Sequence, residues 1–388
     1  MMTYTLRSIG ILALAIVVLA GCDGFLDGDY RPRATGQESE IMVVVDSVHW
    51  DTGLGQSIRD NLAPYVETLP APEREFDLRQ VHLDSDRVFD MVQGHKNVVF
   101  IAPLSDQSNL ANFLRNRLSD DALETVRDGN PAIVSRPDLW RRSQKIYYMT
   151  AADTEQLIDA LERHGERVRS DFHEITLERM ERDMFRRARQ FDLEDTLMAR
   201  HDFAVNVQHD YQIAIDTTTG NTGFMWLRRV LADSRRELMI HYVDGMSTSE
   251  MTPEWIYERR DSLNEKYIRG NLGSFVRTDY RRPLNTHEVD HLGRYGYQTR
   301  GLWHMVYRAD EDAETLQERG AGGPFVNYTF YDQDTDRVYM IDGHVFAPEH
   351  DKRDFLRQME VIAHTFRTRV EAEGASDDED EATLAADD

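Results

Sequence analysis

The sequence predicts two domains: an α/β N-terminal layer sandwich, then an α+β C-terminal domain with a mainly antiparallel sheet and helices packed on it. In the first half, short apolar runs alternate with helical patterns, which is the order of a sheet covered by helices. In the second half, aromatic and β-branched runs follow one another between Gly, Asp and Pro, which is typical of antiparallel strands. A length of 388 residues fits two cores.

The start of the chain predicts a lipoprotein signal peptide over residues 1–21. Arg7 precedes an apolar stretch over residues 9–20 that is too short to span a membrane comfortably. Leu19-Ala-Gly-Cys22 resembles a bacterial lipobox, whose cysteine is acylated and begins the mature protein. Lipidation at Cys22 would anchor the protein to a membrane of the cell envelope, on the periplasmic or the surface side. The alternative is an uncleaved anchor or an ordinary signal peptide with a chance cysteine.

Residues 22–40 are polar and contain glycine and proline, so they predict a flexible tether. The α/β domain is expected over residues 41–165. Its continuous apolar runs at 41–45 and 98–101 are typical of strands buried on both faces. Further strands are expected at 76–83 and 144–150, and helices at 54–66, 86–93, 106–127 and from 153 on.

A helical connector is predicted over residues 166–205. There is no Gly or Pro between Glu166 and Thr219, and apolar residues recur at three- and four-residue steps from Leu177 to Phe191. A second helix is expected over residues 193–200. The methionines in this stripe predict a packing face rather than a cofactor site.

The α+β domain is predicted over residues 206–370. Strands are expected at 211–216, 223–230, 237–243, 295–307, 325–331 and 337–346. A helix with Pro253 in its first turn is expected over 252–268, and the last helix over 351–370, with the helices on one face of the sheet. Residues 371–388 hold nine acidic residues and no basic one, which predicts a disordered acidic tail.

The net charge of -25 argues against nucleic acid as a partner, because phosphate binding requires a basic surface. It also argues against a protein that lies flat on an anionic membrane. The single cysteine excludes an internal disulfide and a zinc site built from cysteines.

Several sequence blocks resemble an uncharacterised family of bacterial envelope lipoproteins, domain of unknown function 4837. The blocks are the lipobox, Trp50, Trp226-Leu-Arg-Arg229, Glu258-Arg-Arg-Asp-Ser262 through Lys266-Tyr267, Arg300-Gly-Leu-Trp303, Gly322-Gly-Pro-Phe325, and Asp342-Gly-His-Val-Phe-Ala-Pro348 leading into Lys352-Arg353-Asp354. The resemblance extends over nearly the whole mature chain. It implies a location and an architecture but no activity, cofactor or catalytic residue.

His287-Glu-Val-Asp-His291 matches the H-E-x-x-H pattern of zinc peptidases, a chemistry that requires a helix. Pro283, Gly293 and Gly296 surround it, and its alternation favours a strand. On a strand, residues four apart are separated by roughly 13 Å, too far for two imidazoles to share one ion. We therefore expect no metal here, and no cofactor is indicated elsewhere.

No catalytic residue is assigned, because the sequence has no G-x-S-x-G elbow and its one cysteine is expected to be acylated. Arginine and tryptophan are common anchors of binding surfaces. The candidate binding residues are Arg229, Arg260, Arg300, Trp303, His344, Lys352 and Arg353, together with Trp226 and Asp354. The alternative is that these charges form ion pairs around a helix start.

The sequence thus predicts a lipid-anchored, two-domain binding or structural protein of the cell envelope, with an envelope protein or a glycan as partner. The alternative is an envelope hydrolase acting on peptides or glycans, which would require two carboxylates close together in a cleft.

Overall fold

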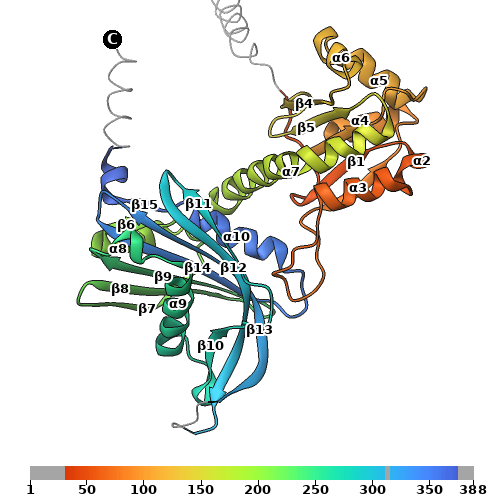
Figure 1. Cartoon of the computed structure of the whole chain (residues 1–388). Helices are drawn as coiled ribbons and strands as arrows, with labels where there is room; N and C mark the ends of the chain where they lie inside the picture. The colour runs from red at the N-terminus through yellow and green to blue at the C-terminus, as the bar shows by residue number, and fades with distance from the viewer. Residues whose placement is uncertain (1–30, 311–314, 375–388) are drawn as a thin grey trace, which may run out of the picture. The chain divides into compact units, whose positions relative to one another are not determined.

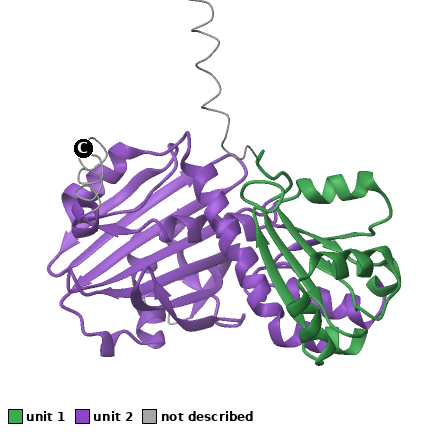
Figure 2. Ribbon diagram, turned by 90° about the horizontal axis from the view of Figure 1, so that it is seen from above, with its two compact units in different colours: residues 1–37, 41–50, 79–157 green, residues 38–40, 51–78, 158–388 purple. Residues whose placement is uncertain are grey.

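The computed structural model describes residues 31–310 and 315–374 and divides them into two compact units (Figures 1 and 2). Unit 1 comprises residues 31–37, 41–50 and 79–157, and unit 2 comprises residues 38–40, 51–78, 158–310 and 315–374. The division between 157 and 158 falls within helix α7 (Thr154–Phe185). No helix in the described ranges is both long enough and apolar enough to cross a membrane.

Unit 1 is built on a five-stranded mixed sheet, which confirms the predicted α/β sandwich. The strand order is β2-β1-β3-β5-β4, in which β3 pairs in parallel with β1 and β5, and β4 is antiparallel to β5. The strands are β1 (Glu40–Val44), β2 (Asp77–Val81), β3 (Asn97–Ile101), β4 (Ala132–Pro137) and β5 (Lys145–Thr150). Every residue of β3 is buried, as its unbroken apolar run predicts.

One predicted helix of unit 1 is two helices, so the expectation of a single helix over 106–127 was wrong. The structure has α5 (Asn109–Arg117) and α6 (Asp120–Arg127). Ser108 accepts a hydrogen bond from the backbone N–H of Ala111, and Ser119 accepts one from that of Ala122. Two serine caps of this kind start two separate helices. The other helices of the N-terminal half are α2 (Ser47–Trp50), α3 (Gly53–Leu62) and α4 (Asp86–Gly94).

Unit 2 contains an antiparallel sheet of eight strands, which confirms the predicted C-terminal architecture. The strand order is β10-β12-β13-β14-β9-β8-β7, and β11 also pairs with β12. The strands are β7 (Gln212–Thr219), β8 (Thr222–Val230), β9 (Arg235–Asp244), β10 (Phe275–Thr278), β11 (Asn285–His291), β12 (Arg294–Arg308), β13 (Leu316–Asp332) and β14 (Arg337–Phe346).

Helices lie on both faces of this sheet, so the expectation that they share one face was wrong. Alternate residues of β14 enter different cores: Ile341 packs with residues of α10 (Arg353–Ala363), whereas Met340 packs with residues of α9 (Pro253–Tyr267). Because both sets of alternate positions are apolar, each face needs a cover. We call the two sides the α9 face and the α10 face (Figure 1).

Helix α10 ends at Ala363, seven residues before the end that the sequence predicts at 370. The hydroxyl of Thr365 donates to the carbonyl of Ile362 and accepts from the backbone N–H of Asn206. The chain then forms β15 (Arg367–Thr368), which pairs with β6 (Phe203–Ala204) just after α8 (Phe191–His201). Capture of the backbone by these partners ends the helix early.

Glu371, the first residue of the predicted acidic tail, contacts the fold. Its carboxylate accepts hydrogen bonds from Arg294, at 2.7 Å, and from the backbone N–H of Thr368, at 2.8 Å. Residues 375–388 of that prediction lie outside the described residues, as do residues 1–30 with the predicted signal peptide and Cys22.

Candidate functional site

The arginines among the candidate binding residues each lie beside a carboxylate, as the ion-pair alternative supposes. The pairs are Arg229–Asp210 at 2.7 Å, Arg260–Asp342 at 2.7 Å, Arg300–Glu360 at 2.6 Å and Arg353–Asp77 at 2.9 Å. Most of the charge of these arginines is therefore used inside the fold, and they do not form one exposed basic cluster.

Lys352 and Arg353 lie at the start of α10. Their backbone N–H groups both donate to the carboxylate of Glu73, at 2.9 to 3.0 Å. A carboxylate at a helix N-terminus satisfies orphan donors and complements the helix dipole. The backbone of these two residues thus serves to fix α10, and Asp354 receives the side chain of Arg353 at 3.2 Å.

Three of the predicted residues come together on the α9 face: Trp226 from β8, Trp303 from β12 and His344 from β14 line one cavity of about 100 Å³. We call this cavity the indole pocket. Its apolar walls are Ile268, Val276, Met305 and Phe346. The carboxyl end of α9 leads directly into this wall, since Ile268 is the residue that follows the helix.

A buried ion pair between His344 and Glu237 forms part of the lining of the indole pocket. Nε2 of His344 lies 2.9 Å from Oε2 of Glu237, and its Nδ1 lies 3.7 Å from Oδ1 of Asp342. Burial opposes the charged imidazolium, but the two carboxylates outweigh it and raise the pKa of His344. Burial likewise opposes charge on Glu237, but His344 and Arg228 outweigh it and lower the pKa of Glu237.

Two indole N–H donors in this pocket lack acceptors. Trp226 is 8% exposed and Trp303 is 5% exposed, and within the described part of the chain neither Nε1 has a hydrogen-bond partner. A buried donor without a partner costs about 1–3 kcal/mol, so such groups are normally satisfied. Both tryptophans line the cavity, and both indole donors are unsatisfied among the described residues.

The rim of the indole pocket is cationic. Arg228 pairs with Glu237 at 3.0 Å and lies 4.6 Å above the Trp226 ring, while Arg235 and Arg269 are exposed. Three guanidinium groups against one carboxylate form a local positive field in a chain of net charge -25. Sequence reasoning missed these residues. The available signal was the alternation of Trp226 and Arg228 along β8. In the register of β8 with β9, Arg228 lies opposite Glu237.

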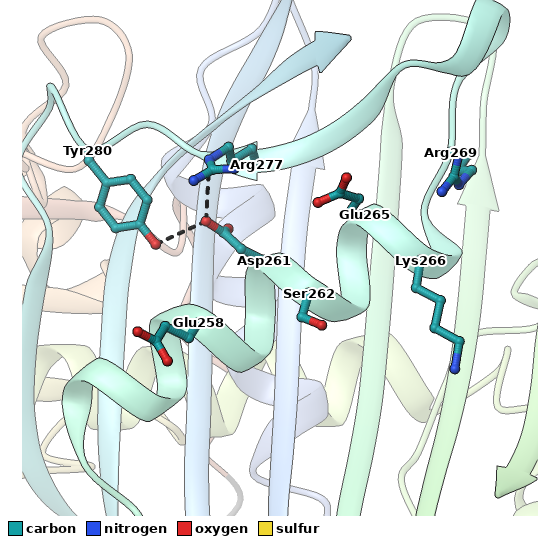
Figure 3. Close-up of a pocket in the computed structure, with 8 residues that line it drawn as sticks. All are labelled: Glu258, Asp261, Ser262, Glu265, Lys266, Arg269, Arg277 and Tyr280. Carbon is teal, nitrogen blue, oxygen red and sulfur yellow. Dashed lines mark hydrogen bonds and ion pairs between the residues drawn. The ribbon is translucent and has the colours of Figure 1, made fainter. Parts of the chain in front are cut away.

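A second hollow, of about 490 Å³, lies along the outer side of α9 (Figure 3). Its central carboxylate is Asp261, which accepts hydrogen bonds from Tyr280 at 2.9 Å and from the Thr278 hydroxyl at 2.8 Å. Burial, and then the charge of Asp261, raises the pKa of Tyr280 to about 12. Asp261 thus acts as a structural acceptor that ties α9 to β10.

The carboxyl groups of the described residues whose pKa is shifted are stabilised in the ionised form. Wherever a carboxyl pKa is shifted in the described ranges it is lowered, as for Asp342 and Glu360, whose burial is outweighed by Arg260 and Arg300 respectively. These groups remain ionised as acceptors for arginine.

The H-E-x-x-H residues lie on β11, as their alternation predicts. His291 is buried, with its ring 4.6 Å from those of Tyr328 and Phe330, whereas His287 is exposed. Across the residues that the structure describes, no three or more His, Cys, Asp or Glu side chains are grouped so that they could hold a metal ion.

Two families match the chain. The family described as Domain of unknown function (DUF4837) matches residues 190–365, and Domain of unknown function (DUF8532) matches residues 34–185. The resemblance to the first family was expected over nearly the whole mature chain, but the match covers only residues 190–365. Trp50 lies in the second match, and the lipobox lies in neither. No curated protein matches the chain.

Among solved structures, the chain is similar to the 1.9 Å crystal structure of the Saccharomyces cerevisiae Ran-binding protein Mog1p. The identity is 9% and the TM-score 0.26, over 43% of this chain and 90% of that one. A likeness of this size carries no inference about this chain.

Proposed function

We propose a binding role for this chain, whose residues 190–365 belong to the family described as Domain of unknown function (DUF4837). The observation that supports it is the pair of buried indole donors, Trp226 and Trp303, which line a cavity and have no acceptor among the described residues. Apolar pockets with a few convergent polar groups are the usual form of a small-molecule site.

The chemistry of the indole pocket suits a carboxylate attached to a small apolar group. Its two indole N–H groups donate to oxygens, and the exposed Arg235 and Arg269 at its rim attract negative charge. The volume of about 100 Å³ corresponds to roughly three water molecules, so only the end of a ligand fits inside. The walls of Val276 and Phe346 suit the apolar part of that end.

We further propose that lipidation of Cys22 holds the protein in the cell envelope, where an envelope protein or a glycan fragment presents the carboxylate. The lipobox supports this location. Cys22→Ala is expected to move the protein from the detergent phase to the aqueous phase on phase partitioning. Retention of the variant in the detergent phase would contradict the anchor without bearing on the pocket.

Tryptophan fluorescence tests the binding role. Isovalerate and benzoate should quench or shift the emission, whereas the matched neutral amides should bind far more weakly, because they lack the charge. Trp226→Phe and Trp303→Phe keep an aromatic wall but remove a donor, so each should weaken carboxylate binding about tenfold.

Trp255→Phe is the matched control, because Trp255 lies at the start of α9 and does not line the pocket. It should lower total emission without changing the affinity. Equal affinity for acids and amides, or unchanged affinity in both pocket variants, would overturn the proposal.

A further inference from the structure

A third cavity, of about 310 Å³, lies between α9 and strands β7, β8 and β9, away from the indole pocket. Its key residues are Arg259 on α9 and His241 on β9. Nδ1 of the buried His241 donates to the carbonyl of Gly223 at 2.6 Å, so Nε2 carries the lone pair that accepts from Nε of Arg259 at 2.9 Å. Burial, and then the charge of Arg259, lowers the pKa of His241 to about 3 and keeps the ring neutral.

Arg259 carries its charge without an anionic neighbour. Within the described ranges it forms no ion pair, and its terminal nitrogens make no hydrogen bond to another residue. Burial lowers the pKa of Arg259. The next residue, Arg260, has two oxygens of Asp342 as acceptors. Two adjacent arginines of one helix therefore differ. The charge of Arg260 is balanced by a carboxylate within the fold, whereas Arg259 is held by the neutral His241 and lines a cavity.

Other donors surround the same space. Lys266 lies two helical turns along α9, with its ammonium 4.7 Å from the Tyr267 ring, and it forms no ion pair with any described residue. Hydroxyl groups of Thr217, Thr219 and Ser262 complete the lining. Two cations and several hydroxyls, with no carboxylate in the lining, are unusual in so acidic a chain.

We infer that this cavity binds a phosphate-class oxyanion, either as the free ion or as a phosphate monoester. Because Nε of Arg259 is bonded to His241, the outer N–H groups of its guanidinium remain to donate to two oxygens of the anion. The ammonium of Lys266 acts as a point charge for a third oxygen, and the hydroxyl groups of the lining supply further donors. The volume exceeds that of a single ion, which leaves space for a small organic part beside the Phe224–Tyr267 stack. This inference does not depend on the function proposed for the indole pocket.

Calorimetric titration of the full chain with inorganic phosphate, at constant ionic strength in a phosphate-free buffer, tests the inference. Saturable binding and a rise in Tm are expected for the wild type. Arg259→Gln should weaken binding about tenfold or more, and Lys266→Gln, on an exposed residue whose loss leaves the fold intact, severalfold. Arg235→Gln removes a guanidinium from the indole pocket on the same face and should leave phosphate affinity unchanged.

Glycerol 3-phosphate and sodium chloride form the other arms of the titration. Tighter binding of glycerol 3-phosphate than of phosphate assigns an organic ester, and equal binding assigns the free ion. Both outcomes support the site. No saturable phosphate binding, an equal response to chloride, or equal loss of affinity in Arg235→Gln and Lys266→Gln would overturn it. Benzoate binding that persists in Arg259→Gln would show that the two cavities are separate.

Discussion

Arg260 and Asp342 form an ion pair that is closed to solvent: Nε of Arg260 lies 2.7 Å from Oδ2 of Asp342, and the two side chains are 1% and 0% exposed. The guanidinium also donates to the Thr278 hydroxyl at 3.0 Å and lies 3.6 Å from the centroid of Phe325. Asn327 donates to the same carboxylate at 3.1 Å. This network fixes α9 on its face of the sheet, and with it the residues of the helix that line the second and the third cavity.

Removing the charge of Asp342 should be costly, because the buried Arg260 would keep only the more distant carboxylate of Asp261, at 3.9 Å, as a counter-ion. Asp342→Asn is expected to lower the free energy of unfolding by about 3–5 kcal/mol, measured by urea denaturation. Glu265→Gln breaks the half-exposed Glu265–Arg308 pair on the same helix and should cost less than about 1 kcal/mol. Equal effects of the two changes would show that the buried pair does not fix the helix.

Stability should fall as the pH falls from 7.5 to 5.0, partly because of His291. Burial, and then the charge of His364, lowers the pKa of His291 to about 3. The unfolded chain takes up this proton near pH 6.5, so over this range it binds more protons than the folded chain does. His291 therefore contributes a loss of about 2 kcal/mol between these pH values, and His241 acts in the same direction.

His291→Phe should remove that contribution, so the difference in unfolding free energy between pH 7.5 and 5.0 should shrink by about 2 kcal/mol. His209→Asn changes an exposed histidine of the same domain and serves as the control. An unchanged pH dependence in His291→Phe would mean that the ring is already protonated in the fold.

Gly343 allows α10 to approach the sheet closely. A Cβ atom at Gly343 would lie 2.4 Å from Cβ of Met359, which real side chains do not tolerate. Gly343→Ala should therefore destabilise this domain by about 1–3 kcal/mol and speed amide hydrogen exchange in β14 and α10. Gly94→Ala is the control, because the nearest atom that its added Cβ would meet, Oγ1 of Thr35, is 3.8 Å away. Equal exchange in both variants would indicate that α10 can shift at no cost.

His287 and His291 should not bind zinc together. Both lie on β11, where residues four apart are separated by roughly 13 Å along the strand. Metal analysis of untagged protein is expected to give far less than one zinc per chain, and Glu288→Gln should leave that value unchanged. Stoichiometric zinc that is lost on His291→Ala would require a different local backbone.

The sequence predicts the order and type of most elements because apolar periodicity reports directly on burial. It fails where a hydrogen bond decides the boundary: Ser119 divides one helical pattern into two helices, and Thr365 ends α10 early. It also fails for β6 and β15, whose two-residue pairing depends on segments more than 160 residues apart. No local pattern records such a contact.

Part of the candidate site could be predicted, since Trp303 and His344 stand out by residue type. The sequence could not show that the charges of Arg229, Arg260, Arg300 and Arg353 are used inside the fold, because their carboxylate partners come from distant segments. For the same reason it could not separate Arg259 from Arg260. Their different roles follow only from which residue of the sheet faces each one.

The β6–β15 pair also determines how the C-terminal domain responds to mechanical load. Phe203 pairs with Thr368 and Ala204 with Arg367, so the segment after α8 and the segment after α10 lie side by side, where Asp202 and Arg369 form an ion pair at 2.7 Å. Tension that separates Asp202 and Arg369 loads the two residue pairs of this short ladder one after the other rather than together. The load also reaches the eight-stranded sheet through the neighbouring residues, because Arg337 of β14 donates to the carbonyl of His201 and Arg294 of β12 donates to Glu371.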